Sequence, residues 1–193
     1  CLSKAAYVLF GKRFIFMIII AGKNNIAVHA LHALVNKLGS HSVGIVPNES
    51  DVGNDSWQRS LIHAARKLGV QIFDLDQVED DSAISCFLSL EFDKIIRVEK
   101  FPKNRVFNIH FSNLPDYKGM YTSLWPILNG DCTAGVSLHR IESGVDTGDI
   151  IASKTFNVAE NFRSYDLYKK YIEYAIEIFD ENIDQLLADN FEA

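Results

Sequence analysis

Two polar residues on one predicted strand are the first candidates for chemistry. Residues 106–110 read Val-Phe-Asn-Ile-His, and side chains at positions i and i+2 of a strand lie on the same face of a sheet. Asn108 and His110 therefore point together near the carboxyl end of the strand, where open α/β sheets bind their ligands. An amide can donate hydrogen bonds, and an imidazole can gain or lose a proton near neutral pH. The pair predicts a reaction site, with an ordinary polar surface as the alternative.

A metal site is a second possibility, since histidine, cysteine and aspartate are common zinc ligands. The candidate ligands are Cys132, His139, His110 and Asp146. They lack the close paired spacing that is typical of zinc sites, so we predict no metal. His139 falls in the middle of a predicted strand, and we expect it to be a structural histidine.

Composition and charge limit the possible functions. The chain has 193 residues, 48% of them apolar and 23% charged, which favours one globular domain. Residues 159–193 hold nine acids and three bases, whereas the preceding residues hold sixteen of each. A nucleic-acid backbone needs a basic face, and the net charge of −6 argues against one, so we predict no nucleic-acid partner. Three cysteines without paired spacing indicate reduced thiols and a cytoplasmic protein.

The first apolar run could be mistaken for a targeting segment. Lys12 and Arg13 precede the run from Phe14 to Ala21, much as basic residues precede the apolar part of a signal peptide. The run is too short to span a bilayer, and no small-x-small cleavage site follows it. We interpret it as a buried first strand and expect no membrane partner. Residues 1–13 are then an N-terminal extension, and we expect residues 14–193 to form a single domain.

Strands and helices alternate in the first half, which predicts a Rossmann-like α/β fold: an open, mostly parallel sheet flanked by helices. Strands are expected at residues 14–21, 42–46, 70–75, 94–98 and 106–110. One helix is expected from a cap at Asn24 or Asn25 to Gly39, and a second from a cap at Ser56 to Gly69. A third helix is expected to start at the acidic pair 80–81.

The second half has a different pattern. A helix is expected at 122–128, followed by strands at 134–141 and 149–156 that are joined by a turn and therefore pair antiparallel. A long helix with one apolar stripe is expected at 164–187. Most of the acidic excess lies on its other face, which we interpret as solvated surface.

Three segments extend the pattern around Asn108 and His110. They read Asn-Ile-His-Phe-Ser-Asn-Leu-Pro-Asp-Tyr-Lys-Gly at 108–119, Gly-Val-Ser-Leu-His at 135–139, and Val-Asp-Thr-Gly-Asp-Ile-Ile at 145–151. Together they resemble the catalytic core of the folate-dependent formyltransferases. The resemblance implies transfer of a formyl group from 10-formyltetrahydrofolate to an amine, through a tetrahedral intermediate that carries an oxyanion, without a metal.

The resemblance also implies roles for individual residues. Asn108 donates its amide N–H to the oxyanion, and His110 relays protons between the amine and the leaving folate nitrogen. Asp146 orients the imidazole and favours its protonated form, because a nearby carboxylate raises a histidine pKa. Whether His110 acts first as an acid or as a base stays open. Four residues of the motif are expected to support its backbone turns rather than to take part in the chemistry: Ser112, Pro115, Gly119 and Gly148.

Differences between this chain and the related enzymes narrow the choice of acceptor substrate. The chain lacks the Gly/Ser-rich phosphate loop of the purine enzyme after its first strand, and it ends in an acidic helix rather than the basic barrel of the methionyl-tRNA enzyme. Residues 120–123 and 164–171 are similar to the sugar-nucleotide N-formyltransferases. This similarity implies a nucleotide amino sugar, a dTDP-linked aminodideoxysugar used for O-antigen and lipopolysaccharide synthesis, as the acceptor.

Contacts with the two substrates follow as expectations. Lys23, Asn24 and Lys118 are candidates for the diphosphate, and Tyr117, Tyr121 and Trp125 for the sugar or thymine. The family places the folate against residues 86–96 and the 139–149 turn. A homodimer is a further possibility that the resemblance raises.

Other functions remain open on the same fold. One is a glycinamide ribonucleotide or other amine formyltransferase, and another is a formyltetrahydrofolate hydrolase, in which water replaces the amine. A third is a binding module without turnover. The complete set of Asn108, His110 and Asp146 argues against the last, because a binding module does not need all three.

Overall fold

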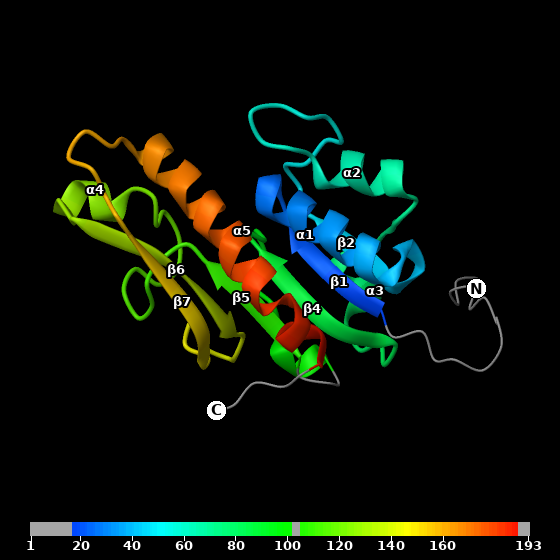
Figure 1. Cartoon of the computed structure of the whole chain (residues 1–193). Coiled ribbons are helices and arrows are strands. Elements are labelled where there is room, and N and C mark those ends of the chain that lie inside the picture. The colour runs from blue at the N-terminus through cyan, green and yellow to red at the C-terminus, as the bar shows by residue number, and fades with distance from the viewer. Residues whose placement is uncertain (1–16, 102–104, 189–193) are drawn as a thin grey trace.

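The structure is a computed structural model, and it describes residues 17–101 and 105–188. The predicted extension at residues 1–13 and the first three residues of the predicted first strand lie outside the described residues. Seven strands form one sheet in the order β3-β2-β1-β4-β5-β6-β7 (Figure 1). Their bounds are β1 Met17–Gly22, β2 Val43–Pro47, β3 Gln71–Ile72, β4 Ile84–Leu90, β5 Val106–His110, β6 Thr133–Arg140 and β7 Ile150–Asn157.

The strand pairing agrees with the predicted fold class. The pairs among β1 to β5 are all parallel, whereas β6 runs antiparallel to both β5 and β7. The helices are α1 Asn24–Leu38, α2 Leu61–Leu68, α3 Leu75–Val78, α4 Trp125–Asn129 and α5 Ser164–Ala188. The mostly parallel sheet, the antiparallel strands at one side and the long final helix are therefore confirmed.

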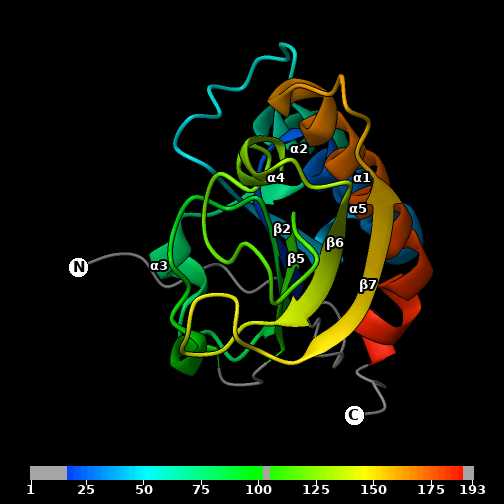
Figure 2. The same cartoon turned by 90° about the vertical axis from the view of Figure 1, so that its left-hand side faces the viewer.

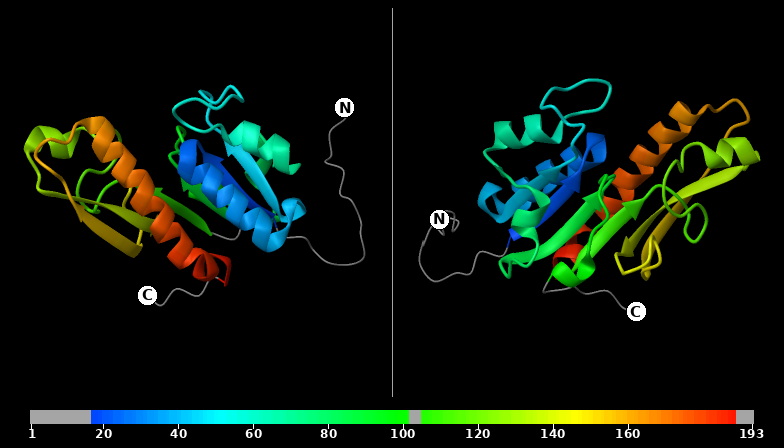
Figure 3. Two further views of the ribbon diagram at one scale, coloured as in Figure 1. Left: turned by 45° about the horizontal axis from the view of Figure 1, so that its top comes forward. Right: turned by 180° about the vertical axis from the view of Figure 1, so that it is seen from behind.

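Two cores lie on opposite faces of the sheet. One contains Ile20, Phe107 and Ile109 and packs against α1, α2 and α5. The other contains Ile19 and Val106 and packs against α3 and the segment that follows β4. Figure 2 shows α1 and α5 on one side of the sheet and α3 on the other, and Figure 3 shows the strands in front of those helices from behind. Because Phe107 and Ile109 face α5, the intervening Asn108 faces the less covered side, as does His110.

The centre of the sheet differs from the prediction. Residues after the acidic pair 80–81 form β4 rather than a helix, and residues 94–98 are a loop that enters a short 3-10 helix at Val98–Lys100 rather than a strand. β4 is paired on both sides, with β1 and β5, so its seven mostly apolar residues form a largely buried central strand. Of the apolar pair that suggested a strand at 94–98, Ile96 packs in the second core while Ile95 is 84% exposed.

The predicted third strand, fourth helix and final helix differ from the structure mainly in length. The strand predicted at 70–75 is shortened to β3, because Asp74 already begins the capping box of α3. The helix predicted at 122–128 is the five-residue α4, which starts near Pro126. α5 matches its predicted bounds to within one residue.

The start of α2 was also predicted wrongly. Its N-cap is Ser60, four residues after the predicted cap at Ser56. The Ser60 hydroxyl accepts the N–H of His63 at 2.9 Å and donates to Asp51 at 2.6 Å. Asp51 in addition accepts the N–H of Ile62 at 3.0 Å, so two side chains bind the free donors at this helix end. Residues 56–59 therefore remain a loop.

Ser60→Ala is expected to lower the free energy of unfolding by about 1 kcal/mol, as the loss of an N-cap side chain usually does. Ser56→Ala is the matched control, since the Ser56 hydroxyl makes two long bonds with the backbone of Gln58, at 3.3 Å and 3.4 Å, and caps no helix. Urea unfolding of both variants measures the difference. A larger loss in Ser56→Ala would contradict the assigned cap.

Candidate active site

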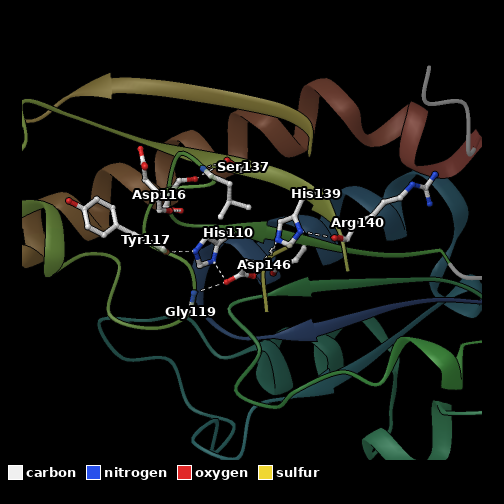
Figure 4. Close-up of polar contacts among 11 residues, drawn as sticks. His110, Asp116, Tyr117, Gly119, Ser137, His139, Arg140 and Asp146 are labelled. Carbon is white, nitrogen blue, oxygen red and sulfur yellow. Dashed lines mark hydrogen bonds and ion pairs between the residues drawn. The ribbon is translucent and has the colours of Figure 1, made fainter. Parts of the chain in front are cut away.

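Asn108 and His110 lie together at the end of β5, as their spacing predicted. β5 lies between β4 and β6 in the sheet, so its backbone is fixed from both sides. Asn108 is partly buried, and His110 is 8% exposed. Figure 4 shows His110 between the 112–119 turn and the turn that carries Asp146. The strand thus presents an amide and an imidazole side by side in a largely enclosed place.

Asp146 reaches the same place from the turn between β6 and β7. Its backbone has a φ of 48°, a left-handed conformation that aspartate adopts more readily than most residues. Its Oδ2 accepts the backbone N–H of Gly119 at 2.8 Å and lies 3.6 Å from Nδ1 of His110. The structure therefore brings together the three residues that the sequence placed in one catalytic set.

The hydrogen bond of the other ring nitrogen fixes the tautomer of His110. Nε2 lies 2.9 Å from the backbone carbonyl of Tyr117. A carbonyl only accepts hydrogen bonds, so Nε2 carries a hydrogen in this arrangement. Nδ1 is then the position that is free to take up a proton, and Asp146 is the group that faces it.

His139 is a site residue that the sequence prediction missed. It is buried, as expected of a structural histidine, but its Nε2 lies 3.1 Å from the amide nitrogen of Asn108 and 3.5 Å from Oδ1 of Asp146. Its Nδ1 lies 2.7 Å from the carbonyl of Arg140 and so donates to it. The signal was the antiparallel register, which places His139 directly opposite Asn108. Spacing within one strand does not reveal that register.

The amide of Asn108 is already bonded within the site. Its Nδ2 donates to His139 at 3.1 Å and approaches Oδ1 of Asp146 at 3.5 Å. The longer contact is the weaker of the two, because hydrogen bonds weaken steeply beyond about 3.2 Å. Donation to a developing oxyanion therefore requires one N–H to leave Asp146, which is the smaller loss.

Burial disfavours the charged form of both titrating groups, but the net outcome differs between them. Burial alone would raise the pKa of Asp146, but His139, His110 and the Gly119 N–H together hold that pKa below its ordinary value. Burial lowers the pKa of His110, and this effect outweighs the opposing influence of Asp146 and of the Tyr117 carbonyl. Asp146 thus favours the protonated imidazole, as the resemblance implied, but burial is the larger influence, so a neutral imidazole and a charged carboxylate are favoured at pH 7.

The turn after β5 is held in place by residues that were predicted to support the backbone. The Ser112 hydroxyl donates to the carbonyl of Asp116 at 2.6 Å, and the bond between Leu114 and Pro115 is cis. Gly119 has a φ of 83°, a conformation that favours glycine, and this presents its N–H to Asp146. The turn therefore supports both His110, through Tyr117, and Asp146, through Gly119.

Gly148 is required by a close approach of two backbones. A Cβ at this position would lie 2.0 Å from the carbonyl oxygen of Arg140. Arg140 is the last residue of β6, and its backbone N–H donates to the carbonyl of Asp149 at 2.9 Å. The backbone on either side of the turn is therefore close together at this point. A side chain at Gly148 would have to push the turn, and Asp146 with it, away from β6.

Gly148→Ala is therefore expected to destabilise the fold by about 1–3 kcal/mol, the usual cost of forcing extra atoms into a packed place, and to lower activity by displacing Asp146. Ser143→Ala is the control, since Ser143 is exposed on the same turn. Urea unfolding measures the stability difference. Gly148→Ala with an unchanged unfolding midpoint would show that the turn accommodates a Cβ.

The predicted substrate-contacting residues are placed differently from one another. Lys118 is exposed, as are Tyr121 and Trp125, and Lys23 is partly exposed at the end of β1. Asn24 is fully buried: its Oδ1 accepts the N–H of Ile26 at 2.9 Å, and its amide donates to Glu91 and to Tyr168. Asn24 thus stabilises the start of α1, the capping role that the sequence also gave it.

Tyr117 faces away from the site. Its hydroxyl bonds with Asp131 and Asn129, at 2.5 Å and 2.7 Å, and Figure 4 shows its ring pointing away from His110. The ring borders a cavity of about 480 Å³ that also touches α4, β6, β7 and α5. Its backbone carbonyl, rather than its ring, takes part in the site.

The two segments expected to hold the folate lie next to each other. Ile141, which opens the turn between β6 and β7, packs in the same core as Phe92 and Ile96 from the loop after β4. Ile95, between them, is 84% exposed. Exposed apolar surface of this kind suits the flat, largely apolar ring system of a folate.

Two absences hold for residues 17–101 and 105–188. Within these ranges, no three His, Cys, Asp or Glu side chains are grouped so that they could hold a metal ion. Over the same ranges, every helix is too short or too polar to cross a bilayer.

Comparison with proteins of known sequence and structure identifies the relatives. The model of the formyl transferase family matches residues 87–183, half of the chain. Methionyl-tRNA formyltransferase of Agathobacter rectalis is 27% identical over 79% of this chain, which spans 53% of that protein. The chain thus spans about half the length of this relative.

Two solved structures are more similar. WlaRD, a sugar 3N-formyl transferase crystallised in the presence of dTDP and 5-N-formyl-THF, is 43% identical with a TM-score of 0.89; the match covers 92% of this chain and 65% of that one. The N-formyltransferase of Helicobacter canadensis, in complex with folinic acid and dTDP-3-aminofucose, is 42% identical with a TM-score of 0.88, over 92% and 66% of the two chains. The sequence match, the fold and the grouped Asn108, His110 and Asp146 agree: this chain belongs to the formyl transferase family.

Proposed function

We propose that this chain transfers a formyl group from 10-formyltetrahydrofolate to the amino group of a nucleotide-linked aminodideoxysugar, with a dTDP-linked sugar as the acceptor. The observation that carries the proposal is the convergence of Asn108, His110 and Asp146 on one face of the sheet, in a chain 43% identical to a sugar 3N-formyl transferase. Both similar structures were obtained with a folate and a thymidine nucleotide, which supports this pair of substrates. Residues 14–193 are the proposed catalytic domain.

The chemistry of the proposal follows from the hydrogen bonds. The folate supplies the formyl carbon. Neutral His110 takes a proton from the attacking amine at Nδ1, and charged Asp146, 3.6 Å away, stabilises the resulting imidazolium. Asn108 donates an amide N–H to the oxygen that becomes negative. His139 keeps Asn108 oriented by accepting its other N–H at 3.1 Å. His110 thus acts first as a base and then returns the proton to the leaving nitrogen.

The substrates are proposed to enter from opposite sides of this site. The folate lies against residues 86–96 and the 139–149 turn, where Ile141 meets Phe92 and Ile96. The acceptor diphosphate lies near Lys23 and Lys118, and Tyr121 and Trp125 line the sugar side. In this proposal the formylated sugar is used in O-antigen and lipopolysaccharide synthesis, and the reaction takes place in the cytoplasm. Two chains act together as a homodimer, without a nucleic-acid or membrane partner.

A transfer-RNA acceptor is the second candidate, because a relative with 27% identity is a methionyl-tRNA formyltransferase. The charge of α5 argues against it. Two lysines already pair with carboxylates of this helix: Lys154 of β7 meets Glu177 and Glu181, and Lys170 of α5 pairs with Glu173. The excess of acids on this helix repels a phosphate backbone.

The proposal is tested by mixing the protein with 10-formyltetrahydrofolate and a panel of dTDP-linked amino sugars, together with glycinamide ribonucleotide and methionyl-tRNA. The measurements are the release of tetrahydrofolate and a formyl mass increment on each acceptor. Product with one amino sugar is the expected result. Release of tetrahydrofolate without any acceptor would identify a hydrolase, and folate binding without turnover would identify a binding module.

The activity is expected to depend on pH through His110. Burial lowers the pKa of His110, so the neutral base is present above the ordinary histidine value of about 6.5 and is lost only as the pH falls through the lower folded value. Below about pH 6.5 the unfolded chain binds a proton that the folded chain does not, so the free energy of unfolding also decreases there. A profile of kcat/KM against pH should rise and level off before neutrality. An acid limb with a midpoint above 6.5 would contradict the buried, neutral imidazole.

A further inference from the structure

Tyr117 connects the active site to the corner between α4 and β6. Its backbone carbonyl accepts the Nε2–H of His110 at 2.9 Å, and its ring points the opposite way (Figure 4). The hydroxyl at the far end of the ring donates to Asp131 at 2.5 Å and accepts from the amide of Asn129 at 2.7 Å. One residue therefore contacts the catalytic imidazole with its backbone and another part of the fold with its side chain.

The backbone of Tyr117 needs support from its surroundings. Its φ is 50°, a left-handed conformation that tyrosine rarely adopts and that persists only where neighbouring contacts enforce it. Packing leaves one side of the ring open, because the ring borders the 480 Å³ cavity described above. The two hydrogen bonds of the hydroxyl therefore fix where the ring lies, and with it the carbonyl of the same residue.

The two residues that hold the hydroxyl have fixed positions themselves. Asn129 is the last residue of α4, and the N–H of Asp131, two positions later, donates to the carbonyl of Pro126 at 2.9 Å. The carbonyl of Cys132 accepts the N–H of Val158, the residue after β7, at 2.9 Å. Asp131 thus lies between a closed helix end and a paired strand, so its carboxylate is held in one place.

The Tyr117 carbonyl matters because two acceptors compete for the single ring hydrogen of a neutral imidazole. Asp146 faces Nδ1 of His110 at 3.6 Å, and a carboxylate in that place favours a hydrogen on Nδ1. A hydrogen there would leave Nδ1 unable to take a proton from an amine. The Tyr117 carbonyl, 2.9 Å from Nε2, favours the hydrogen on the other nitrogen and leaves Nδ1 open.

We propose that Tyr117 is a positioning residue for formyl transfer, which acts on His110 through its backbone carbonyl. Its hydroxyl, held by Asp131 and Asn129, keeps that carbonyl against Nε2 of His110, so that Nδ1 stays ready to take up a proton. The inference rests on the proposed function and deepens it, because it names what selects the tautomer in which His110 can act as a base. It also changes the role of Tyr117 from contact with the sugar or thymine to support of the imidazole.

The position of the hydrogen on His110 can be measured without any substrate. The six histidines of the chain are labelled with nitrogen-15, and the signals of His110 are those absent from His110→Asn. Above the ordinary histidine pKa of about 6.5, the unmodified chain is expected to carry the hydrogen on Nε2. Tyr117→Phe, which removes the hydroxyl but keeps the ring, is expected to move a measurable part of the population to the Nδ1–H tautomer. Identical His110 signals in the two proteins would overturn the proposal.

Kinetics give the size of the effect. Tyr117→Phe is expected to lower kcat about tenfold with little change in either KM, as when an outer hydrogen-bond partner of a functional histidine is lost. Asp131→Ala should act in the same way, and Asp131→Asn should lose less, because the asparagine oxygen still accepts from the hydroxyl. Tyr174→Phe is the matched control, since it removes a tyrosine hydroxyl from α5, where the ring packs on Phe156 with ring centres 4.6 Å apart. Equal losses in Tyr117→Phe and Tyr174→Phe would overturn the assigned role.

The pH profile adds a readout that a merely structural residue would not change. Burial, the largest influence, lowers the pKa of His110, and so does His139 of β6. Asp146 of the β6–β7 turn and the Tyr117 carbonyl raise the same pKa. Loosening the carbonyl removes one of the two influences that raise it, so the acid limb of kcat/KM should move to lower pH in Tyr117→Phe. An acid limb that stays in place or moves to higher pH would contradict the role of the carbonyl.

The outcomes separate this inference from the function on which it rests. If His110 changes its tautomer in Tyr117→Phe but the unmodified chain formylates none of the acceptors, the support of His110 by Tyr117 stands and the proposed function fails. If the unmodified chain formylates an amino sugar and the tautomer in Tyr117→Phe is unchanged, the proposed function stands and the inference fails. Thermal unfolding of each variant shows that the fold is intact in these comparisons.

Discussion

Replacing His110 by asparagine is expected to lower kcat for formyl transfer by about 10²- to 10⁴-fold, the range that a positioned acid–base group contributes. Asparagine overlays only the Nδ1 side of the ring, so it loses the 2.9 Å contact that His110 Nε2 makes with the carbonyl of Tyr117, and it cannot take up a proton beside Asp146. The KM values for both substrates should change little, because the imidazole moves a proton rather than binding a substrate. Single-turnover kinetics with saturating folate and acceptor measures the step directly.

Two controls keep this result interpretable. His41→Asn changes an exposed histidine and should leave kcat unaltered. Thermal unfolding of the His110 variant shows whether the fold is intact, and the acid limb of the pH profile should be absent from its residual activity. A His110 variant with more than a tenth of the normal kcat would contradict the role of the imidazole.

Replacing Asn108 by alanine is the second large effect, with kcat expected to fall by about 10²- to 10³-fold, as it does when a single oxyanion donor is removed. The amide is the group within the site whose N–H can reach a developing negative charge once it leaves the 3.5 Å contact with Asp146. The loss should fall on kcat and kcat/KM equally, because the interaction is made in the transition state and not with the bound substrate.

The Asn108 variant also tests its neighbours. Asn108→Ala leaves His139 Nε2 without its 3.1 Å partner, so a double-variant comparison with His139→Ala should show strongly non-additive losses. Asn36→Ala, on the exposed side of α1, is the control for the change of residue type. Additive losses in the double variant would show that His139 does not act through Asn108.

The sequence predicted the fold where patterning was strong. The long apolar stripe at 164–187 became α5, and the turn between two short apolar runs became the antiparallel pair β6 and β7. It was wrong at the centre of the sheet, because a short apolar run such as 84–90 has the same composition in a buried strand and in a buried helix. Only its two neighbours, β1 and β5, decide between them.

The candidate site was predictable where it depended on local geometry. Two residues at i and i+2 on a strand share a face whatever the rest of the fold does, which placed Asn108 beside His110. His139 depended on strand register, and the neutral state of His110 depended on how much protein covers it. Burial also determined the environment of Asn24. This polar residue after a strand was interpreted as a ligand contact, but it is buried under Glu91 and Tyr168. Burial and register are properties of the whole chain.

The central claim is that the formyl group goes to an amine, and following the formyl carbon tests it most directly. The protein is given 10-formyltetrahydrofolate labelled with carbon-13 in the formyl group, together with the dTDP-linked amino sugar that reacts best, and the products are examined by carbon-13 NMR. The account predicts that the label appears as a formamide on the sugar nitrogen, and that His110→Asn abolishes this signal. Label that appears only as free formate, at the same rate with and without the sugar, would contradict it.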